Sequence, residues 1–142
     1  MVPPTQKFLA TSRRIMSFSN HREPKASDRV IYIDGDFDMM HNGHIELLRK
    51  AKESGDFLYV GIYDDNIVYQ LKGNNFPILS LNERVLMVLA NKFVDDVIIG
   101  APLVVGEDLI KTFNIASVVQ GDKHFEDINS YCNKCELLGD PY

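Results

Sequence analysis

The sequence alternates between two kinds of segment, and this alternation constrains the fold more than any other feature. Short, continuously apolar runs rich in β-branched residues are separated by longer segments whose apolar residues recur at helical spacing. The four apolar runs are residues 29–33, 57–62, 94–99 and 115–120. Strands that are apolar on both faces belong to parallel sheets covered by helices on both sides. The pattern therefore predicts an α/β fold with one parallel sheet.

The segments between these runs carry helix boundary signals. Gly55 follows the first segment as a glycine helix stop. Ser80 and Glu83 have the spacing of a capping box, which marks the start of another helix. The predicted helices cover residues 42–54, 81–91 and 107–113, with a helical turn around residues 66–71.

The two ends of the chain differ from the middle. The apolar residues between Phe8 and Phe18 lie near helical spacing and predict a short amphipathic helix, followed by a polar linker. Beyond residue 122 we predict no strand or helix. We therefore expect an N-terminal helix and linker at residues 1–28 and one domain at residues 29–142, with its C-terminal part cut short.

Composition places the chain among ordinary globular proteins. Its 142 residues are 45% hydrophobic and 25% charged, enough for one domain with a real core. The formal net charge of −5 is uneven, with +4 over residues 1–29 and −9 over residues 30–142. An acidic body repels phosphate backbones, so we expect no nucleic-acid partner. No apolar run reaches the ~18 residues of a membrane span, and we see no signal peptide, so we expect no membrane insertion and a cytoplasmic location.

The sharpest motif runs from Gly35 to His44 and has the sequence Gly-Asp-Phe-Asp-Met-Met-His-Asn-Gly-His. It lies between the first predicted strand and the first predicted helix, and parallel sheets bind ligands at this turn. Backbone amides at a helix start attract phosphate. The imidazoles of His41 and His44 suit a phosphate that gains negative charge, and Gly43 allows close approach of backbone or ligand. The motif thus predicts a catalytic phosphate site.

Metal binding is a weaker interpretation of the histidines and cysteines. His41 and His44 lack a third ligand and the glutamate of a His-Glu-x-x-His helix. Cys132 and Cys135 form a single Cys-x-x-Cys, whereas a structural zinc site needs four ligands, and His124 stands only at loose spacing. Two cysteines also exclude a disulfide scaffold. We expect a reduced surface pair and no metal centre.

The motif resembles the Gly-x-Phe-Asp-x-x-His-x-Gly-His signature of the cytidylyltransferases, within the nucleotidyltransferase superfamily. Further segments match in the same order: Lys72-Gly73, Asn82-Glu83-Arg84, Lys92-Phe93-Val94-Asp95-Asp96-Val97 and Gly121-Asp122. The segments from Pro77 to Arg84 and from Val97 to Pro102 are similar to the second of two tandem repeats in the cytidylyltransferases that act on ethanolamine phosphate. The resemblance covers roughly residues 6–122 and implies a Rossmann-like nucleotidyltransferase fold.

The resemblance implies transfer of CMP from CTP to phosphoethanolamine, giving CDP-ethanolamine and pyrophosphate for phospholipid biosynthesis. His41, His44 and Lys72 would then be the catalytic residues, acting on the phosphates. The implied nucleotide-binding residues are Gly35, Asp36, Phe37, Asp38, Gly43, Arg84, Gly121 and Asp122. The implied partners are CTP with Mg²⁺, phosphoethanolamine and the N-terminal repeat of a longer chain, and a homodimer is compatible with the resemblance.

Some of these residues have a structural alternative. Lys72 could be a solvated loop lysine. Arg84 could pair with Glu83 or Asp95 and only brace the fold. The Asp95-Asp96 pair precedes a buried strand, so we expect these two residues to be structural or at the surface.

Two departures from the family pattern leave other functions open. Asp36 stands where relatives have a small neutral residue, and a carboxylate beside a triphosphate is unfavourable by on the order of 1 kcal/mol. The family's Arg-Thr-x-Gly-Ile-Ser-Thr-Thr segment, which holds CTP phosphates, is absent from the 142 residues. One alternative is therefore a catalytically degenerate regulatory repeat of the same enzyme, and another is an adenylyltransferase of the same superfamily. An aminoacyl-tRNA synthetase shares the His-x-Gly-His loop, but this chain is short and lacks a Lys-Met-Ser-Lys-Ser loop.

Overall fold

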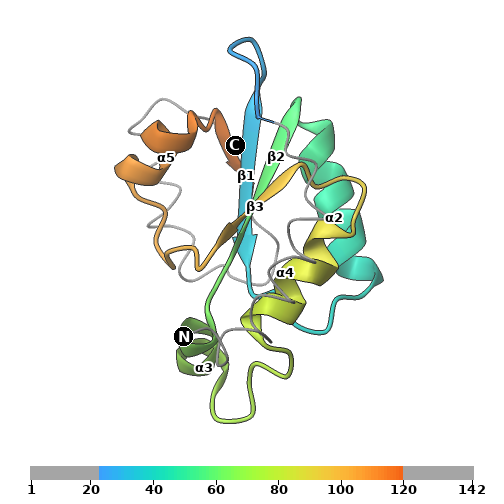
Figure 1. Ribbon diagram of the computed structural model, residues 1–142, viewed down its shortest axis with the longest axis vertical. Coiled ribbons are helices and arrows are strands. Elements are labelled where there is room, and N and C mark those ends of the chain that lie inside the picture. Colours follow the sequence, from blue (N-terminus) through green and yellow to red (C-terminus); the bar gives the residue numbers. More distant parts are fainter. Residues whose placement is uncertain (1–22, 120–142) are drawn as a thin grey trace, which may run out of the picture.

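The computed structural model describes residues 23–119, which form a four-stranded sheet with helices on both faces (Figure 1). In chain order the elements are β1 (Val30–Gly35), α2 (Asn42–Glu53), β2 (Phe57–Ile62), α3 (Asp65–Lys72), α4 (Leu81–Leu89), β3 (Asp96–Ile99), α5 (Glu107–Phe113) and β4 (Ser117–Val119). The strand order is β3-β2-β1-β4, and every neighbouring pair is parallel. The predicted α/β fold with one parallel sheet is confirmed.

Two apolar layers cover this sheet. On one face, α2 and α4 pack against fully buried strand residues that include Ile31, Ile33 and Val60. On the other face, Tyr32 packs in a cluster with Phe113 of α5. Successive strand side chains point to opposite faces, so an apolar strand needs a cover on both sides. Figure 1 shows that cover, with α5 on one side of the sheet and α2 with α4 on the other.

Element boundaries follow the sequence pattern closely, and they shift where strand pairing decides. The structure confirms the bounds predicted for β2 and α5. β1 extends beyond the predicted run because its pairing with β2 continues to Gly35, opposite Ile62. β3 begins at Asp96 rather than at residue 94, because Asp96 is the first residue registered with β2. The described part of β4 pairs with β1 over residues 117–119, within the predicted run.

The helical turn predicted around residues 66–71 is wrong in extent. The structure has a complete helix there, α3, of eight residues. The missed signal is Asp64, which is the N-cap and whose Oδ1 accepts the N–H of Ile67 at 2.9 Å. The start of α4 is as predicted, since Ser80 is its N-cap and the Ser80 hydroxyl accepts the N–H of Glu83 at 3.5 Å.

The sheet topology puts the loop between β1 and α2 at a ligand-binding position. The strand order reverses at β1, because the chain passes from β1 to β2 and β3 on one side and returns to β4 on the other. In open parallel sheets, ligands bind at this point, beyond the carboxyl ends of the strands. The loop leaves β1 at that edge, which faces the α3 end of the molecule in Figure 1.

Several predictions concern residues outside the range 23–119. They are the N-terminal amphipathic helix, the site residues Gly121 and Asp122, and the cysteine pair with His124. They stay predictions, as does the division at residue 28. Within the described range, no helix is both long enough and apolar enough to cross a membrane.

Candidate functional site

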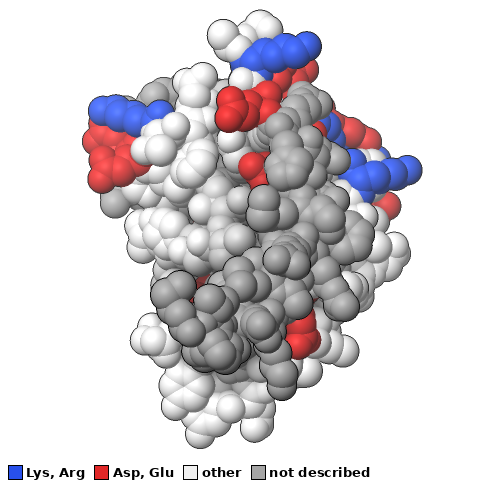
Figure 2. Space-filling view, viewed as in Figure 1, with Lys and Arg blue, Asp and Glu red and all other residues white. Residues whose placement is uncertain are grey.

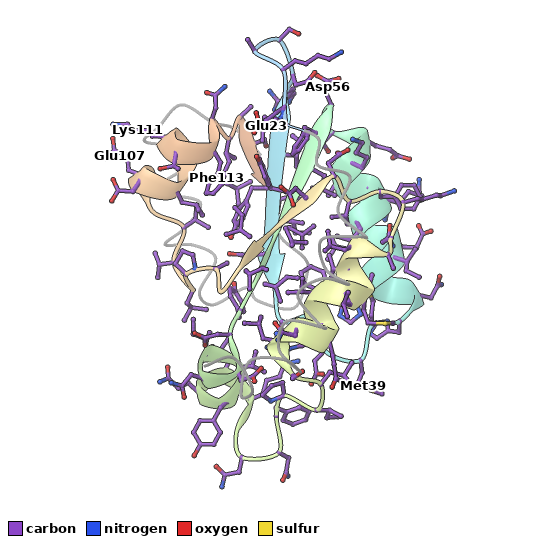
Figure 3. The ribbon with its side chains drawn as sticks, viewed as in Figure 1. Glu23, Met39, Asp56, Glu107, Lys111 and Phe113 are labelled. Atoms are coloured by element: carbon purple, nitrogen blue, oxygen red, sulfur yellow. The ribbon has the colours of Figure 1, made fainter. Side chains whose placement is uncertain are left out.

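The loop between β1 and α2 has a backbone conformation that large residues seldom adopt. Phe37 and Met39 have φ angles of 50° and 48°, in the left-handed region where Cβ crowds the backbone. Strain of this kind persists where surrounding contacts hold it, and it is concentrated at functional sites. Phe37 is buried, and its ring centroid lies 5.7 Å from that of His44. Met39 is exposed and marks the position of the loop in Figure 3.

The two histidines form a reciprocal cap at the start of α2. His41 is the N-cap residue, and its Nδ1 atom accepts the N–H of Gly43 at 3.0 Å. The Nδ1 atom of His44 accepts the N–H of His41 at 3.1 Å. The two ring centroids lie 4.1 Å apart. Backbone hydrogen bonds therefore hold both imidazoles side by side at the helix start.

This cap determines which ring nitrogen can act on a ligand. An Nδ1 atom that accepts an N–H carries no proton, so the neutral rings carry their proton at Nε2. Each Nε2–H is then a hydrogen-bond donor, at a helix start whose amides already favour an anion. His41 is exposed, and His44 is half-buried. The arrangement can stabilise a phosphate, which is the role that the motif predicts.

Gly43 and Gly35 leave room for the rings of this loop. A Cβ atom on Gly43 would lie 2.8 Å from Cε1 of His41, and one on Gly35 would lie 3.1 Å from the Phe37 ring. A side chain at position 43 would push the imidazole out of its cap. The steric reason for these glycines is thus the packing of the loop's own rings.

Lys72 reaches the loop from the end of α3. Its Nζ atom lies 2.5 Å from Oδ2 of Asp36 and 5.7 Å from the centre of the Phe76 ring. The alternative of a loop lysine is wrong, because Lys72 is the last residue of α3; its side chain is exposed, as that alternative expects, but its ammonium is paired with Asp36. Burial raises the pKa of Asp36, but the hydrogen bond and charge of Lys72 and the amide of Asp38 outweigh burial and lower it. Asp36 is thus ionised at neutral pH.

Asp38 ties the loop to the segment before α4. Its Oδ2 atom accepts the N–H of Ile78 at 2.7 Å, and its Oδ1 atom accepts the N–H of Leu79 at 2.9 Å. Both carboxylate oxygens are therefore engaged by backbone amides. These bonds support the shape of the loop, and a contribution of Asp38 to nucleotide binding stays a prediction.

Arg84 is completely buried and connects four segments around the site. Its acceptors are the carbonyl oxygens of Asp36 (2.8 Å), Tyr63 (2.7 Å) and Leu79 (3.1 Å) and Oδ1 of Asp65 (2.7 Å). These bonds use most of the five N–H donors of a guanidinium. The structure thus places Arg84 in a supporting position, and a direct contact with the nucleotide stays a prediction.

The ion-pair partners that the structural alternative predicted for Arg84 are wrong. Among the described residues, its ion-pair partner is Asp65 rather than Glu83 or Asp95. Asp95 instead contacts the ammonium of Lys52, and its Oδ2 atom accepts a backbone N–H of β2 at 2.8 Å. The structural role predicted for Asp95 is confirmed.

Asp34 is a further candidate that the sequence motif does not include. It is the penultimate residue of β1, and burial raises its pKa to about 7, although hydrogen bonds from the Tyr63 side chain and from its own backbone act to lower it. Within residues 23–119, its Oδ2 atom has no hydrogen-bond partner. Buried carboxylates with perturbed pKa values are frequent at functional sites. The available sequence signal is an aspartate that directly follows a buried apolar run.

Figure 2 shows acidic and basic side chains next to each other in the upper part of the face drawn. Among residues 23–119, no three His, Cys, Asp or Glu side chains are grouped as ligands of one metal ion.

A family model and the sequences of known proteins assign the chain to the same family. Residues 32–140 match the model of the cytidylyltransferase-like family. An ethanolamine-phosphate cytidylyltransferase of Arabidopsis thaliana is 55% identical over 114 residues, which cover 80% of this chain and 27% of that protein. A protein of the same name from Dictyostelium discoideum is 51% identical over 115 residues, which cover 81% of this chain and 32% of that protein.

A solved structure also shares the fold. The lipopolysaccharide core biosynthesis protein from Thermoplasma volcanium superposes with a TM-score of 0.65 and 25% identity, over 80% of this chain and 90% of that one. This chain spans about a third or less of the length of the curated relatives that it matches. Because the family match extends over most of the chain and includes the histidine loop, the chain belongs to the cytidylyltransferase-like family.

Proposed function

We propose that this domain transfers CMP from CTP to phosphoethanolamine, giving CDP-ethanolamine and pyrophosphate. The observation that carries the proposal is the pair of histidines whose Nδ1 atoms accept backbone amides at the start of α2. In this proposal the two Nε2–H groups donate to a phosphate bound beyond the carboxyl ends of the strands, where parallel folds bind such ligands. The names of the relatives at 51% and 55% identity supply the substrates.

The proposed reaction is an in-line displacement at the α-phosphorus of CTP. A phosphate oxygen of phosphoethanolamine forms the new P–O bond, the bond to the β-phosphate breaks, and pyrophosphate leaves. No covalent bond to the protein forms, so catalysis consists of positioning and charge stabilisation. In this proposal His41 and His44 donate to oxygens that gain charge, and Lys72 neutralises a substrate phosphate.

The remaining residues position these groups. The amides of Asp36 and Phe37 and the start of α2 would cradle a phosphate. Arg84 supports this loop through its hydrogen bond to the carbonyl of Asp36. By resemblance to the family, Gly121 and Asp122 are assigned to the ribose or the base.

Magnesium enters this proposal as part of the substrate, Mg·CTP. Mg²⁺ keeps several waters and binds through substrate phosphates with one or two carboxylates, so it needs no protein cage. The complex also carries less negative charge than free CTP, which favours its approach to an acidic domain.

Asp34 is a candidate contact for the ammonium group of phosphoethanolamine. A cation beside its buried carboxylate would lower the pKa from about 7 and give the Oδ2 atom a partner. We expect Asp34→Asn to raise KM for phosphoethanolamine by about tenfold, the factor that corresponds to 1.4 kcal/mol, while KM for CTP stays unchanged. An equal rise in both KM values would show a general disturbance of the site rather than loss of an ammonium contact.

Product analysis separates this function from its alternatives. The chain is incubated with Mg·CTP and radiolabelled phosphoethanolamine, and in parallel with Mg·ATP in place of CTP. Formation of CDP-ethanolamine supports the proposal, whereas turnover with ATP alone indicates an adenylyltransferase. Binding of CTP without turnover, also after the chain is joined to the N-terminal repeat of a relative, indicates a regulatory repeat.

A further inference from the structure

The carboxylate of Asp36 lies where a substrate phosphate is expected. Its Oδ2 atom accepts a charged hydrogen bond from Lys72 at 2.5 Å, and its Oδ1 atom accepts the N–H of Asp38 at 3.3 Å. An ammonium and a loop amide are the kinds of group that the proposed function assigns to a phosphate. Asp36 therefore already binds groups that the proposed function assigns to a phosphate.

The surroundings strengthen this contact. The side chain of Asp36 is 12% exposed and that of Lys72 is 40% exposed, so the pair is screened by solvent less than a pair on the open surface. Asp36 also belongs to the loop itself, and its negative charge would repel a second anion placed beside it. An incoming phosphate must consequently compete with this carboxylate for Lys72.

We propose that Asp36 is a positioning residue that restrains Lys72 and thereby lowers the affinity of the site for polyphosphate. The inference rests on the proposed function, which assigns Lys72 to a substrate phosphate. The ligand class that Asp36 controls is the polyphosphate group of a nucleoside triphosphate, whichever base it carries. This chain thus binds polyphosphate more weakly than the same site with a neutral residue at position 36.

The structure around the ion pair indicates that the side chain of Asp36 can be replaced without disturbing the loop. The carbonyl oxygen of Asp36 accepts from Arg84 at 2.8 Å, and this bond does not depend on the side chain at position 36. Lys72 lies over the Phe76 ring at 5.7 Å, a second contact that keeps the ammonium near the loop. Asp36→Asn retains an oxygen for the amide of Asp38 and removes the charge. We expect the variant to fold. The ammonium of Lys72 should lose its ion pair with position 36 but stay near the loop, over the Phe76 ring.

Titration calorimetry with inorganic tripolyphosphate tests the restraint in the 142-residue chain. We expect Asp36→Asn to bind tripolyphosphate about tenfold more tightly than the unmodified chain. Glu107→Gln is the matched control, because it removes one negative charge from an ion pair with Lys111 on α5. Figure 3 shows Glu107 and Lys111 on the side of the molecule away from Met39 of the loop. The control variant should bind within about twofold of the unmodified chain.

A second substitution tests whether Asp36 affects polyphosphate binding through Lys72. Lys72→Gln should weaken tripolyphosphate binding by less than about threefold in the unmodified chain, where Asp36 holds the ammonium, and by about tenfold in Asp36→Asn. A merely structural role of Asp36 would not produce tighter binding or this dependence on background. Equal effects of Lys72→Gln in the two backgrounds would overturn the proposal. Unchanged or weaker binding by Asp36→Asn would overturn it as well.

Parallel titrations with Mg·CTP separate this inference from the proposed function. Tighter tripolyphosphate binding by Asp36→Asn, without CTP selectivity or CTP turnover, would support the restraint and refute CMP transfer. CTP turnover by the unmodified chain, without any affinity gain in Asp36→Asn, would refute the restraint and leave CMP transfer standing. Thermal unfolding of each variant verifies that it is folded, and Asp36→Ala serves as the second neutral variant if Asp36→Asn is not.

Discussion

Replacing Arg84 is expected to destabilise the domain far more than the loss of one ion pair would. Its side chain is fully buried, and it donates to three backbone carbonyl oxygens as well as to Asp65. Arg84→Ala leaves these acceptors without their donor and creates a cavity. A buried acceptor that loses its donor costs about 1–3 kcal/mol, so losing several of these bonds removes a large share of the free energy of unfolding, which is about 5–15 kcal/mol for a whole protein. We expect Arg84→Ala to be only marginally folded.

Arg84→Lys separates charge from hydrogen-bond geometry. A lysine keeps a positive charge near Asp65, but a compact ammonium with three donors cannot reach acceptors that lie around a planar guanidinium. We expect a loss of about 2 kcal/mol in the free energy of unfolding, from one or two charged hydrogen bonds. Arg49→Lys on α2 is the matched control, because Arg49 pairs with Glu46 and Glu53 at the exposed surface. The control should leave the free energy of unfolding unchanged within error.

Urea unfolding followed by circular dichroism measures these free energies, with the slope of the transition as a test that the variants unfold over the same surface. Arg84→Lys should also weaken tripolyphosphate binding, since the carbonyl of Asp36 loses its support. Stability of Arg84→Lys equal to that of the unmodified chain would refute the argument that the hydrogen-bond geometry, and not the charge, is what holds this residue.

Three further predictions concern the histidines, Asp34 and the N-terminus. In a form of the enzyme that turns over CTP, His41→Ala and His44→Ala should lower kcat by about 10²-fold and change KM for CTP less; steady-state kinetics with full activity in both would contradict this. The pKa of Asp34 is raised to about 7, so between about pH 4 and pH 7 the folded state holds a proton that the unfolded chain has lost, and its contribution to stability declines as pH rises through this range. Asp34→Asn should therefore be more stable than the unmodified chain at pH 8 and similar at pH 4, as measured by urea unfolding. Deletion of residues 1–20 should lower Tm or solubility, because the predicted apolar stripe needs a cover; no change in either would indicate a passive linker.

The sheet could be predicted because strands that are buried on both faces are continuously apolar, and such runs can be recognised in the sequence. Every apolar run in the described range became a strand, and both faces of the sheet received helices. The ends of the strands were less predictable. Asp95 follows an apolar valine and precedes β3, but its carboxylate contacts the backbone of β2 and Lys52, and the pairing with β2 starts at Asp96 rather than at residue 94. Strand ends depend on register with a neighbour, which composition does not contain.

The site residues could be predicted as a set but not as an arrangement. The spacing of His41 and His44 indicates one side of a helix start, and the structure adds that each ring accepts a backbone amide. Arg84 stands in the first turn of α4, where charged residues are ordinarily solvated. Its burial arises from acceptors on segments as far away in sequence as Asp36. Such a set of acceptors is created only by the tertiary fold.

Taken together, these contacts make the histidine loop a preorganised element. Asp38 and Arg84 both bond to Leu79, one through its N–H and the other through its carbonyl oxygen, so the segment before α4 and the loop support each other. The positive φ angle of Phe37 is then retained by contacts on both sides of the loop rather than by the loop's own sequence. A loop held in this way needs no reordering when a phosphate binds, so its affinity is set by the charges present rather than by the cost of ordering. Asp36 is the carboxylate within that loop that pairs with Lys72 and so competes with a phosphate, which is why a single carboxylate can have a measurable effect on binding in a domain whose fold and histidine pair it leaves intact.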